Sequence, residues 1–228
     1  MSSAAYSALS GWLSPPAAHA AILNLSERLR LDVDAFPTLA LNGTSVIITY
    51  DGGTTLIMIN RESETDFYAM DPTCTDQRQQ LPIFNFTYTN TIVCPLHGSQ
   101  FDIRGQVLNG PAVSNLNTYA TQFEGPSTLN VEVSGFVHRL DEIAVHSTSP
   151  GNTRMKLTFP TMNGSLYKIR YSPDLASPFE VAFFSTTPAG AADQDIFEAT
   201  GAPATVYVDT PGDAGFFTLE LMVFQLAP

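Results

Sequence analysis

The sequence predicts an all-β protein, and three observations support this fold class. Thr, Val, Ile, Phe and Tyr are plentiful, and these residues favour strands over helices. The 15 Gly and 16 Pro residues supply many turns. From residue 36 onward, apolar and polar residues alternate in short runs bounded by Gly, Pro or Asn. A chain of 228 residues is long enough to bury a core, as one large domain or two small ones.

The alternation predicts a first group of antiparallel strands, in a domain that spans residues 31–146. The tight turn Asp51-Gly52-Gly53 is expected to join the first two strands as a hairpin. The Ser-Thr-Ser-Pro-Gly-Asn segment at 147–152 is interpreted from its composition as a linker. The expected strands of this domain are 45–50, 54–60, 66–70, 91–94, 99–103, 118–123 and 129–133.

Residues 153–228 predict a second domain, a small β-sandwich. This part of the chain contains no His and no Cys, so its expected role is adhesion, packing or assembly rather than chemistry. Its turn from Tyr167 to Leu175 resembles one found in small modules at the ends of exported bacterial proteins. The expected strands are 154–159, 167–171, 179–183, 204–208 and 216–223.

Residues 1–30 differ from the rest of the chain. A short helix is expected, with Ser14 as its cap and Ile22, Leu25 and Leu29 on one face. The same segment resembles an export signal, because residues 18–20 have the small-x-small form of a cleavage site. The basic start of such a signal is missing. Helix and signal can each apply to a different half of the segment.

The charge balance excludes some partners. The chain carries 22 acidic and 10 basic residues, a formal net charge of −12, and its only lysines are Lys156 and Lys168. Nucleic acids and anionic lipid surfaces need a basic patch, so neither is an expected partner. No apolar run is long enough for a transmembrane helix. A protein partner with a basic surface fits the charge better.

The densest group of chemically useful residues is the segment 94–112, Cys-Pro-Leu-His-Gly-Ser-Gln-Phe-Asp-Ile-Arg-Gly-Gln-Val-Leu-Asn-Gly-Pro-Ala. Cys94 ends a strand, and a tight loop can aim its thiolate and the His97 imidazole at one point. Gly98 lets the backbone turn back into the next strand, and Gly110-Pro111 forms a further loop that can lean over the first. This segment resembles the second cluster-binding loop of Rieske [2Fe–2S] proteins. The resemblance covers about residues 31–137 and implies stacked antiparallel sheets with a two-loop, cluster-binding subdomain.

In that family each of two loops supplies one Cys and one His, with both Cys on one iron and both His on the other. The resemblance therefore implies that Cys74, Cys94 and His97 are ligands of a [2Fe–2S] cluster. The first loop reads Cys74-Thr75-Asp76, with Asp76 where the family has a His. The Asp oxygen lies two bonds beyond Cβ, as His Nδ1 does, and ferric iron accepts a carboxylate, so Asp76 is interpreted as the fourth ligand.

Two alternatives stay open at this stage. The site can be degenerate, with its cluster lost. Cys74 and Cys94 can instead form a disulfide in an exported protein, which would stabilise the fold by roughly 3 kcal/mol for a loop of about 20 residues.

The resemblance also assigns a cofactor-binding role to four residues around the ligands, namely Gly98, Ser99, Phe101 and Pro111. Ser99 stands where the family's serine donates a hydrogen bond to a bridging sulfide. Phe101 replaces a tyrosine donor of high-potential members. Both the missing donor and an anionic Asp76 ligand predict a lower reduction potential.

Two classes of function follow. The first is an electron-transfer protein, or a small redox subunit of an oxidoreductase, that acts with a redox partner protein. The second is a Rieske-fold module without a cluster, which serves structure or protein interaction in an exported assembly. An oxygenase is rejected, because no His remains after His146 for a mononuclear iron site. The expected location is periplasmic or extracellular, with the cytoplasm as the alternative.

Overall fold

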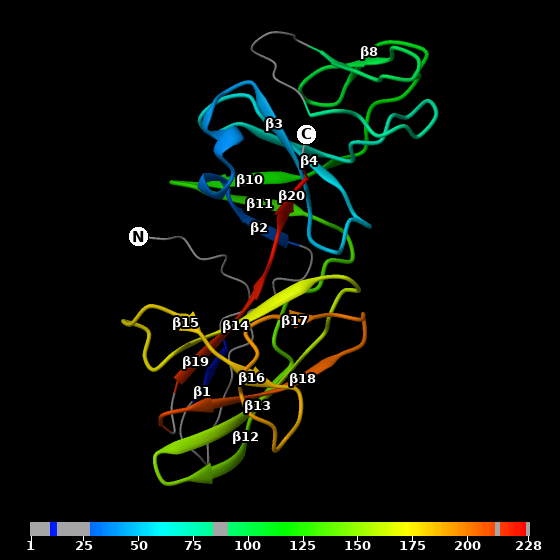
Figure 1. The fold of residues 1–228 in the computed structure, drawn as a ribbon. Helices are drawn as coiled ribbons and strands as arrows, with labels where there is room; N and C mark the ends of the chain where they lie inside the picture. The colour runs from blue at the N-terminus through cyan, green and yellow to red at the C-terminus, as the bar shows by residue number, and fades with distance from the viewer. Residues whose placement is uncertain (1–9, 13–27, 84–90, 213–214, 227–228) are drawn as a thin grey trace.

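The fold is all-β, as predicted, in a computed structural model that describes residues 10–12, 28–83, 91–212 and 215–226 (Figure 1). Twenty strands form five antiparallel sheets in these residues. The described helices are two short 3₁₀ turns, η1 (Val33–Ala35) and η2 (Pro37–Ala40). In the described residues no helix is long and apolar enough to cross a membrane.

Three sheets build the part of the molecule at the top of Figure 1. The five-stranded sheet has the order β20 (Phe224–Gln225), β3 (Thr44–Thr49), β4 (Ile57–Arg61), β5 (Phe67–Met70) and β9 (Thr118–Tyr119). A three-stranded sheet has the order β10 (Thr121–Glu124), β11 (Thr128–Glu132) and β2 (Arg28–Asp32). The third sheet is the small one that follows the first loop, in the order β6 (Ile92–Val93), β7 (Gln100–Phe101) and β8 (Val107–Asn109).

Two further sheets, at the bottom of Figure 1, form a C-terminal sandwich, which also takes in residues 10–12 and 142–149 from outside the expected range 153–228. One has the order β12 (Glu142–Ser149), β13 (Asn152–Phe159), β18 (Ala204–Thr210) and β16 (Phe184–Ser185). The other has the order β1 (Ser10–Trp12), β19 (Gly215–Leu221), β14 (Leu166–Ser172) and β15 (Glu180–Val181), and β17 (Phe197–Glu198) also pairs with β14.

Strand β3 is buried on both faces, which explains its continuous apolar run. Val46 and Ile48 point into a first core, whereas Ile47 points into a second. The first core continues from this sheet into both sheets of the C-terminal sandwich, where Leu157 and Leu219 belong to it. The second core lies beneath the loops that carry the two cysteines.

The chain returns to its starting sheet at the C-terminus. After β19, the last strand β20 runs back from the sandwich and pairs with β3, with Phe224 opposite Thr49 (Figure 1). Leu226 then donates its backbone N–H to the Ile47 carbonyl at 2.9 Å and packs against the second core.

Three details differ from the expectations. The prediction of a linker at 147–152 is wrong, because Ser147 pairs with Arg154 and the segment belongs to the hairpin of β12 and β13. Leu29 lies in β2 rather than on a helix, because Leu29 and Leu31 alternate inward while β2 pairs with β11. The rest of that predicted helix, residues 14–27, lies outside the described residues. The strand expected at 118–123 is two strands that change sheets at Ala120.

Candidate metal centre

The two loops that carry the cysteines share one backbone pattern. In the first, Cys74 donates its N–H to the Gln79 carbonyl at 2.8 Å, and its own carbonyl accepts from Arg78 at 2.9 Å. In the second, Cys94 donates to the Ser99 carbonyl at 2.8 Å and accepts from Gly98 at 3.0 Å. Each cysteine thus bonds to the fifth and fourth residues after it, so the two loops are structural copies.

The fourth residue after each cysteine has a left-handed backbone, with φ of 76° at Gly98 and 56° at Arg78. Gly98 adopts this conformation at no steric cost, and sequence reasoning anticipated its turn. Arg78 is the equivalent residue in the first loop, and its role was missed because an Arg gives no signal for a positive φ. Placing the two loops in register on their cysteines would have revealed it.

The two thiols are buried side chains of the second core. Cys74 is 1% exposed and Cys94 is 2% exposed, and both are free cysteines. The disulfide alternative is therefore not formed in this structure. Burial raises the pKa of the Cys74 thiol, and the backbone N–H of Asp76 opposes that shift.

Asp76 and His97 meet at the tips of the two loops. The Nδ1 atom of His97 lies 2.8 Å from Oδ2 of Asp76. Their side chains are 22% exposed for Asp76 and 39% exposed for His97, so this pair faces solvent while the thiols do not. These two atoms, Nδ1 of His97 and Oδ2 of Asp76, each lie two bonds beyond Cβ, so the two side chains have the same reach.

The third loop, after β8, holds the other two in place. The buried Ser99 hydroxyl accepts the Ala112 N–H at 3.0 Å, and Thr75 donates its hydroxyl to the Ser114 carbonyl at 2.7 Å. The third loop thus contacts both cysteine loops. The bridging role of Thr75 was also missed, because only the fold brings residues 75 and 114 together.

The structure distributes the remaining predicted site residues around this centre. Phe101 is fully buried in the second core, beside the cysteines, and offers no hydroxyl donor. Pro111 is exposed on the third loop, next to Ala112. A Cβ added at Gly98 would meet nothing within 4 Å, so the space over that residue is open.

The donors come as two pairs rather than as one group. In the described part of the chain, no three His, Cys, Asp or Glu side chains gather where a single metal ion could bind. One thiol pair and one carboxylate–imidazole pair, each drawn from both loops, suit a group with two metal atoms.

Comparison with known proteins agrees with this geometry. Residues 33–120 match the family model described as Rieske [2Fe-2S] domain. This match confirms, for these residues, the resemblance to Rieske [2Fe–2S] proteins seen in the sequence.

A curated relative and two solved structures are also similar to part of the chain. The relative is the cytochrome b6-f complex iron-sulfur subunit of Prochlorococcus marinus, 32% identical over 72 residues, or 32% of this chain. The chain spans only 39% of the length of that relative. The plasma membrane Rieske protein PetC3 from Synechocystis PCC 6803 is 27% identical, covering 41% of this chain and 99% of that one, with a TM-score of 0.33. The ferredoxin of carbazole 1,9a-dioxygenase from Nocardioides aromaticivorans is 23% identical, covering 47% and 98%, with a TM-score of 0.37.

Proposed function

We propose that the chain is an electron-transfer protein, or a redox subunit, that holds a [2Fe–2S] cluster with an atypical ligand set. Cys74 and Cys94 would hold one iron, and Asp76 and His97 would hold the other. When bound, such a cluster supplies one-electron transfer at the tips of the two loops.

The approach of His97 Nδ1 to Asp76 Oδ2 is the observation that carries this proposal. A carboxylate that replaces an imidazole must bring its oxygen to the place where the imidazole nitrogen would be. The 2.8 Å contact brings that oxygen beside the Nδ1 atom through which a Rieske histidine binds, with no displacement of the loops. The buried, free thiols complete the set with soft ligands suited to iron–sulfur binding.

The residues around the ligands would tune the reduction potential downward. Asp76 would contribute a negative charge to the site, and reduction adds another, so the oxidised state is favoured. Phe101 replaces a hydroxyl donor with an apolar ring, which leaves fewer hydrogen bonds to stabilise added charge. We therefore propose a potential below that of a Rieske protein with two His ligands and a tyrosine donor.

Iron and sulfide analysis of anaerobically purified protein tests this function. We expect about two irons and two sulfides per chain, and an EPR signal after reduction. Cys74→Ala, Cys94→Ala and His97→Ala should each abolish both, because a ligand is lost outright. Both cysteines of the chain are buried, so the chain offers no exposed cysteine for a control. Ser114→Ala, an exposed position on the third loop, serves as the matched control. A colourless parent protein, or three variants with the spectrum of the parent, would contradict the proposal.

A second function stays a candidate because of the same contact. Asp76 and His97 satisfy each other by a direct hydrogen bond, so the loops need no metal to pair these groups. In this alternative the Rieske fold is a scaffold without a cluster, and the C-terminal sandwich mediates assembly. An iron-free parent protein that keeps its fold would favour it.

The partner and the location also belong to the proposal. Because the relative named above is a subunit of a cytochrome complex, we propose that electrons pass to or from a partner protein. The net charge of −12 favours a partner with a basic surface. If so, the association rate should fall steeply as salt is added. Fractionation of the producing cells would test the proposed periplasmic or extracellular location.

A further inference from the structure

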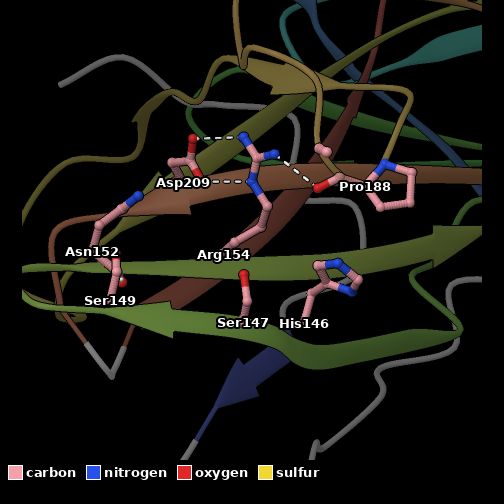
Figure 2. A pocket seen from close by; sticks show the side chains of 8 residues that line it. His146, Ser147, Ser149, Asn152, Arg154, Pro188 and Asp209 are labelled. Atoms are coloured by element: carbon pink, nitrogen blue, oxygen red, sulfur yellow. Dashed lines mark hydrogen bonds and ion pairs between the residues drawn. The ribbon is translucent and has the colours of Figure 1, made fainter.

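The C-terminal sandwich lies at the opposite end of the molecule from the cysteine loops (Figure 1). It contains an open pocket of about 400 Å³ (Figure 2). We call it the sandwich pocket. Residues 188–189 form one wall, and its other lining residues are His146, Ser147, Ser149, Asn152, Arg154 and Asp209. Its volume lies within the usual range for small-molecule sites.

The floor of the pocket is an ion pair between Arg154 and Asp209, which carries no net charge. Arg154 donates from Nε and Nη2 to the two oxygens of Asp209, both at 2.8 Å (Figure 2). The hydrogen bonds from Arg154 lower the pKa of Asp209, so the carboxylate stays ionised and cancels the guanidinium. A charged ligand therefore finds neither a free cation nor a free anion here.

The wall of the pocket is fixed by the same arginine. Nη1 of Arg154 donates to the carbonyls of Pro188 at 2.9 Å and Gly190 at 2.8 Å. A Cβ at Gly190 would lie 2.3 Å from the Ser185 hydroxyl, so a larger residue there would displace that side chain from the loop. The site is thus held open before any ligand binds, which reduces the entropy that binding must cost.

A β-bulge turns two adjacent side chains toward this space. The register of β12 against β13 shifts between Val145 and Ser147, so His146 is the extra residue. His146 and Ser147 both line the pocket, although neighbours on a regular strand point to opposite faces (Figure 2). The imidazole rests edge-on against Tyr207, with ring centroids 4.9 Å apart.

Hydrogen-bonding capacity remains at the mouth of the pocket. Within the described chain, neither the His146 ring nitrogens nor the Ser147 hydroxyl makes a hydrogen bond. Both groups donate and accept, as do the hydroxyls of a sugar. The lining is mainly polar, which disfavours an apolar ligand. The described residues include no three metal-ligating side chains together, which disfavours a metal ion.

We propose that the sandwich pocket binds a neutral, polyhydroxylated ligand, namely one saccharide unit. The ligand would bond to His146 and Ser147 at the mouth and would face the Arg154–Asp209 pair at the floor. Its C–H surface would lie against Pro188 and Ala189. This site is independent of the cluster, and it gives the C-terminal sandwich a binding role of its own.

Saturation-transfer NMR on the full chain tests the proposal, with a panel of neutral hexoses, pentoses and N-acetylhexosamines as probes. We expect transfer to at least one sugar, with a dissociation constant in roughly the millimolar range. His146→Ala and Ser147→Ala should each weaken binding about fivefold, the loss of one hydrogen bond. Iron content should not change in either variant, which separates this test from the test of the cluster.

Gln122→Ala is the matched control, because Gln122 is an exposed residue lining a second polar pocket of about 310 Å³. It should bind sugar as the parent does. Three results would overturn the proposal: no transfer to any sugar in the panel, equal binding by the Ser147→Ala variant, or binding of sulfate rather than sugar at His146.

Discussion

Gly98 and Arg78 show how single residues set the geometry of the loops. They hold equivalent positions in the two cysteine loops, and both have a positive φ. Only one of them is a glycine, so the first loop retains a backbone strain that the second avoids. The hydrogen bond from each residue to its cysteine carbonyl depends on this turn.

Gly98→Ala should lower the free energy of unfolding by about 1–2 kcal/mol, the cost of a left-handed backbone for a residue with a Cβ. The added methyl group meets no atom within 4 Å, so a clash cannot account for the loss. Arg78→Gly is the paired control and should not lower stability, because it relieves the same strain. Urea denaturation followed by circular dichroism measures both. A Gly98→Ala variant as stable as the parent would contradict this reading of the loop.

The identity of the residue at position 76 should set the reduction potential. Asp76→His replaces an anionic ligand by a neutral one, so the potential should rise. The control Asp102→Asn removes a negative charge from the hairpin that follows His97 and leaves the ligand set intact, so its effect should be smaller. An EPR-monitored redox titration measures both changes. An unchanged or lower potential in Asp76→His would mean that Asp76 is not a ligand.

At the scale of elements, the last strand links the sandwich to the cysteine loops. β20 pairs with β3, and Leu226 packs against the second core, which contains Cys74 and Cys94. β3 is thereby covered along one edge and buried on both faces. The stability of the loops should therefore depend on residues far away in the sequence.

Ending the chain after Val223 should destabilise the protein by roughly 1–3 kcal/mol, as ladder hydrogen bonds and apolar contacts are lost. The thiols of metal-free protein should also react faster with a thiol reagent, because the second core loses part of its cover. Phe224→Ala keeps the strand and serves as control, since its side chain is 42% exposed. Identical labelling rates in the truncated and full-length chains would show that β20 does not support the loops.

At the scale of the whole molecule, an imidazole lies where the two halves meet. His138 is 2% exposed and stacks between Phe136 and Tyr167, with centroids 6.0 Å away on each side. Its Nε2–H donates to the Leu219 carbonyl of β19 at 2.9 Å. Nδ1 is buried and has no partner in the described residues, so the neutral form is the one that fits. Burial lowers the pKa of His138 to about 4.

Stability should consequently fall as the pH drops from about 6.5 to about 4. In that window the unfolded chain binds a proton at residue 138 and the folded chain does not, so acid favours unfolding. The contribution is roughly 3 kcal/mol for a shift of this size. The pKa of His138 is lowered by burial, and no carboxylate contributes to the shift. The titratable side chain that stacks on the His138 ring is Tyr167.

His138→Phe keeps an aromatic ring between Phe136 and Tyr167 but cannot bind a proton, so it provides the comparison. Denaturation curves measured at several pH values should show a weaker pH dependence in this variant than in the parent between about pH 4 and 6.5. If stability depends on pH to the same extent in the two proteins, His138 binds no extra proton on unfolding in this pH range, and the prediction is wrong.

Short-range patterns made much of this protein predictable. The alternation of apolar residues located β5, β11, β13, β14 and β18, because the two faces of a strand differ within a few residues. The segment 94–112 and the cysteine at 74 predicted the match to the Rieske [2Fe–2S] domain, because loop turns and donor spacing are local properties of the chain.

Other features were decided only by the tertiary structure. Residues 147–149 read as a linker by composition, yet pairing with β13 makes them strand. Leu29 and Leu226 have their roles because distant segments pair with them or pack against them. The sandwich pocket joins side chains from residues 146 to 209. The physical reason is the same in each case: sheet order, shared cores and loop closure depend on contacts between residues far apart in the chain, and local sequence carries no record of which segments will meet.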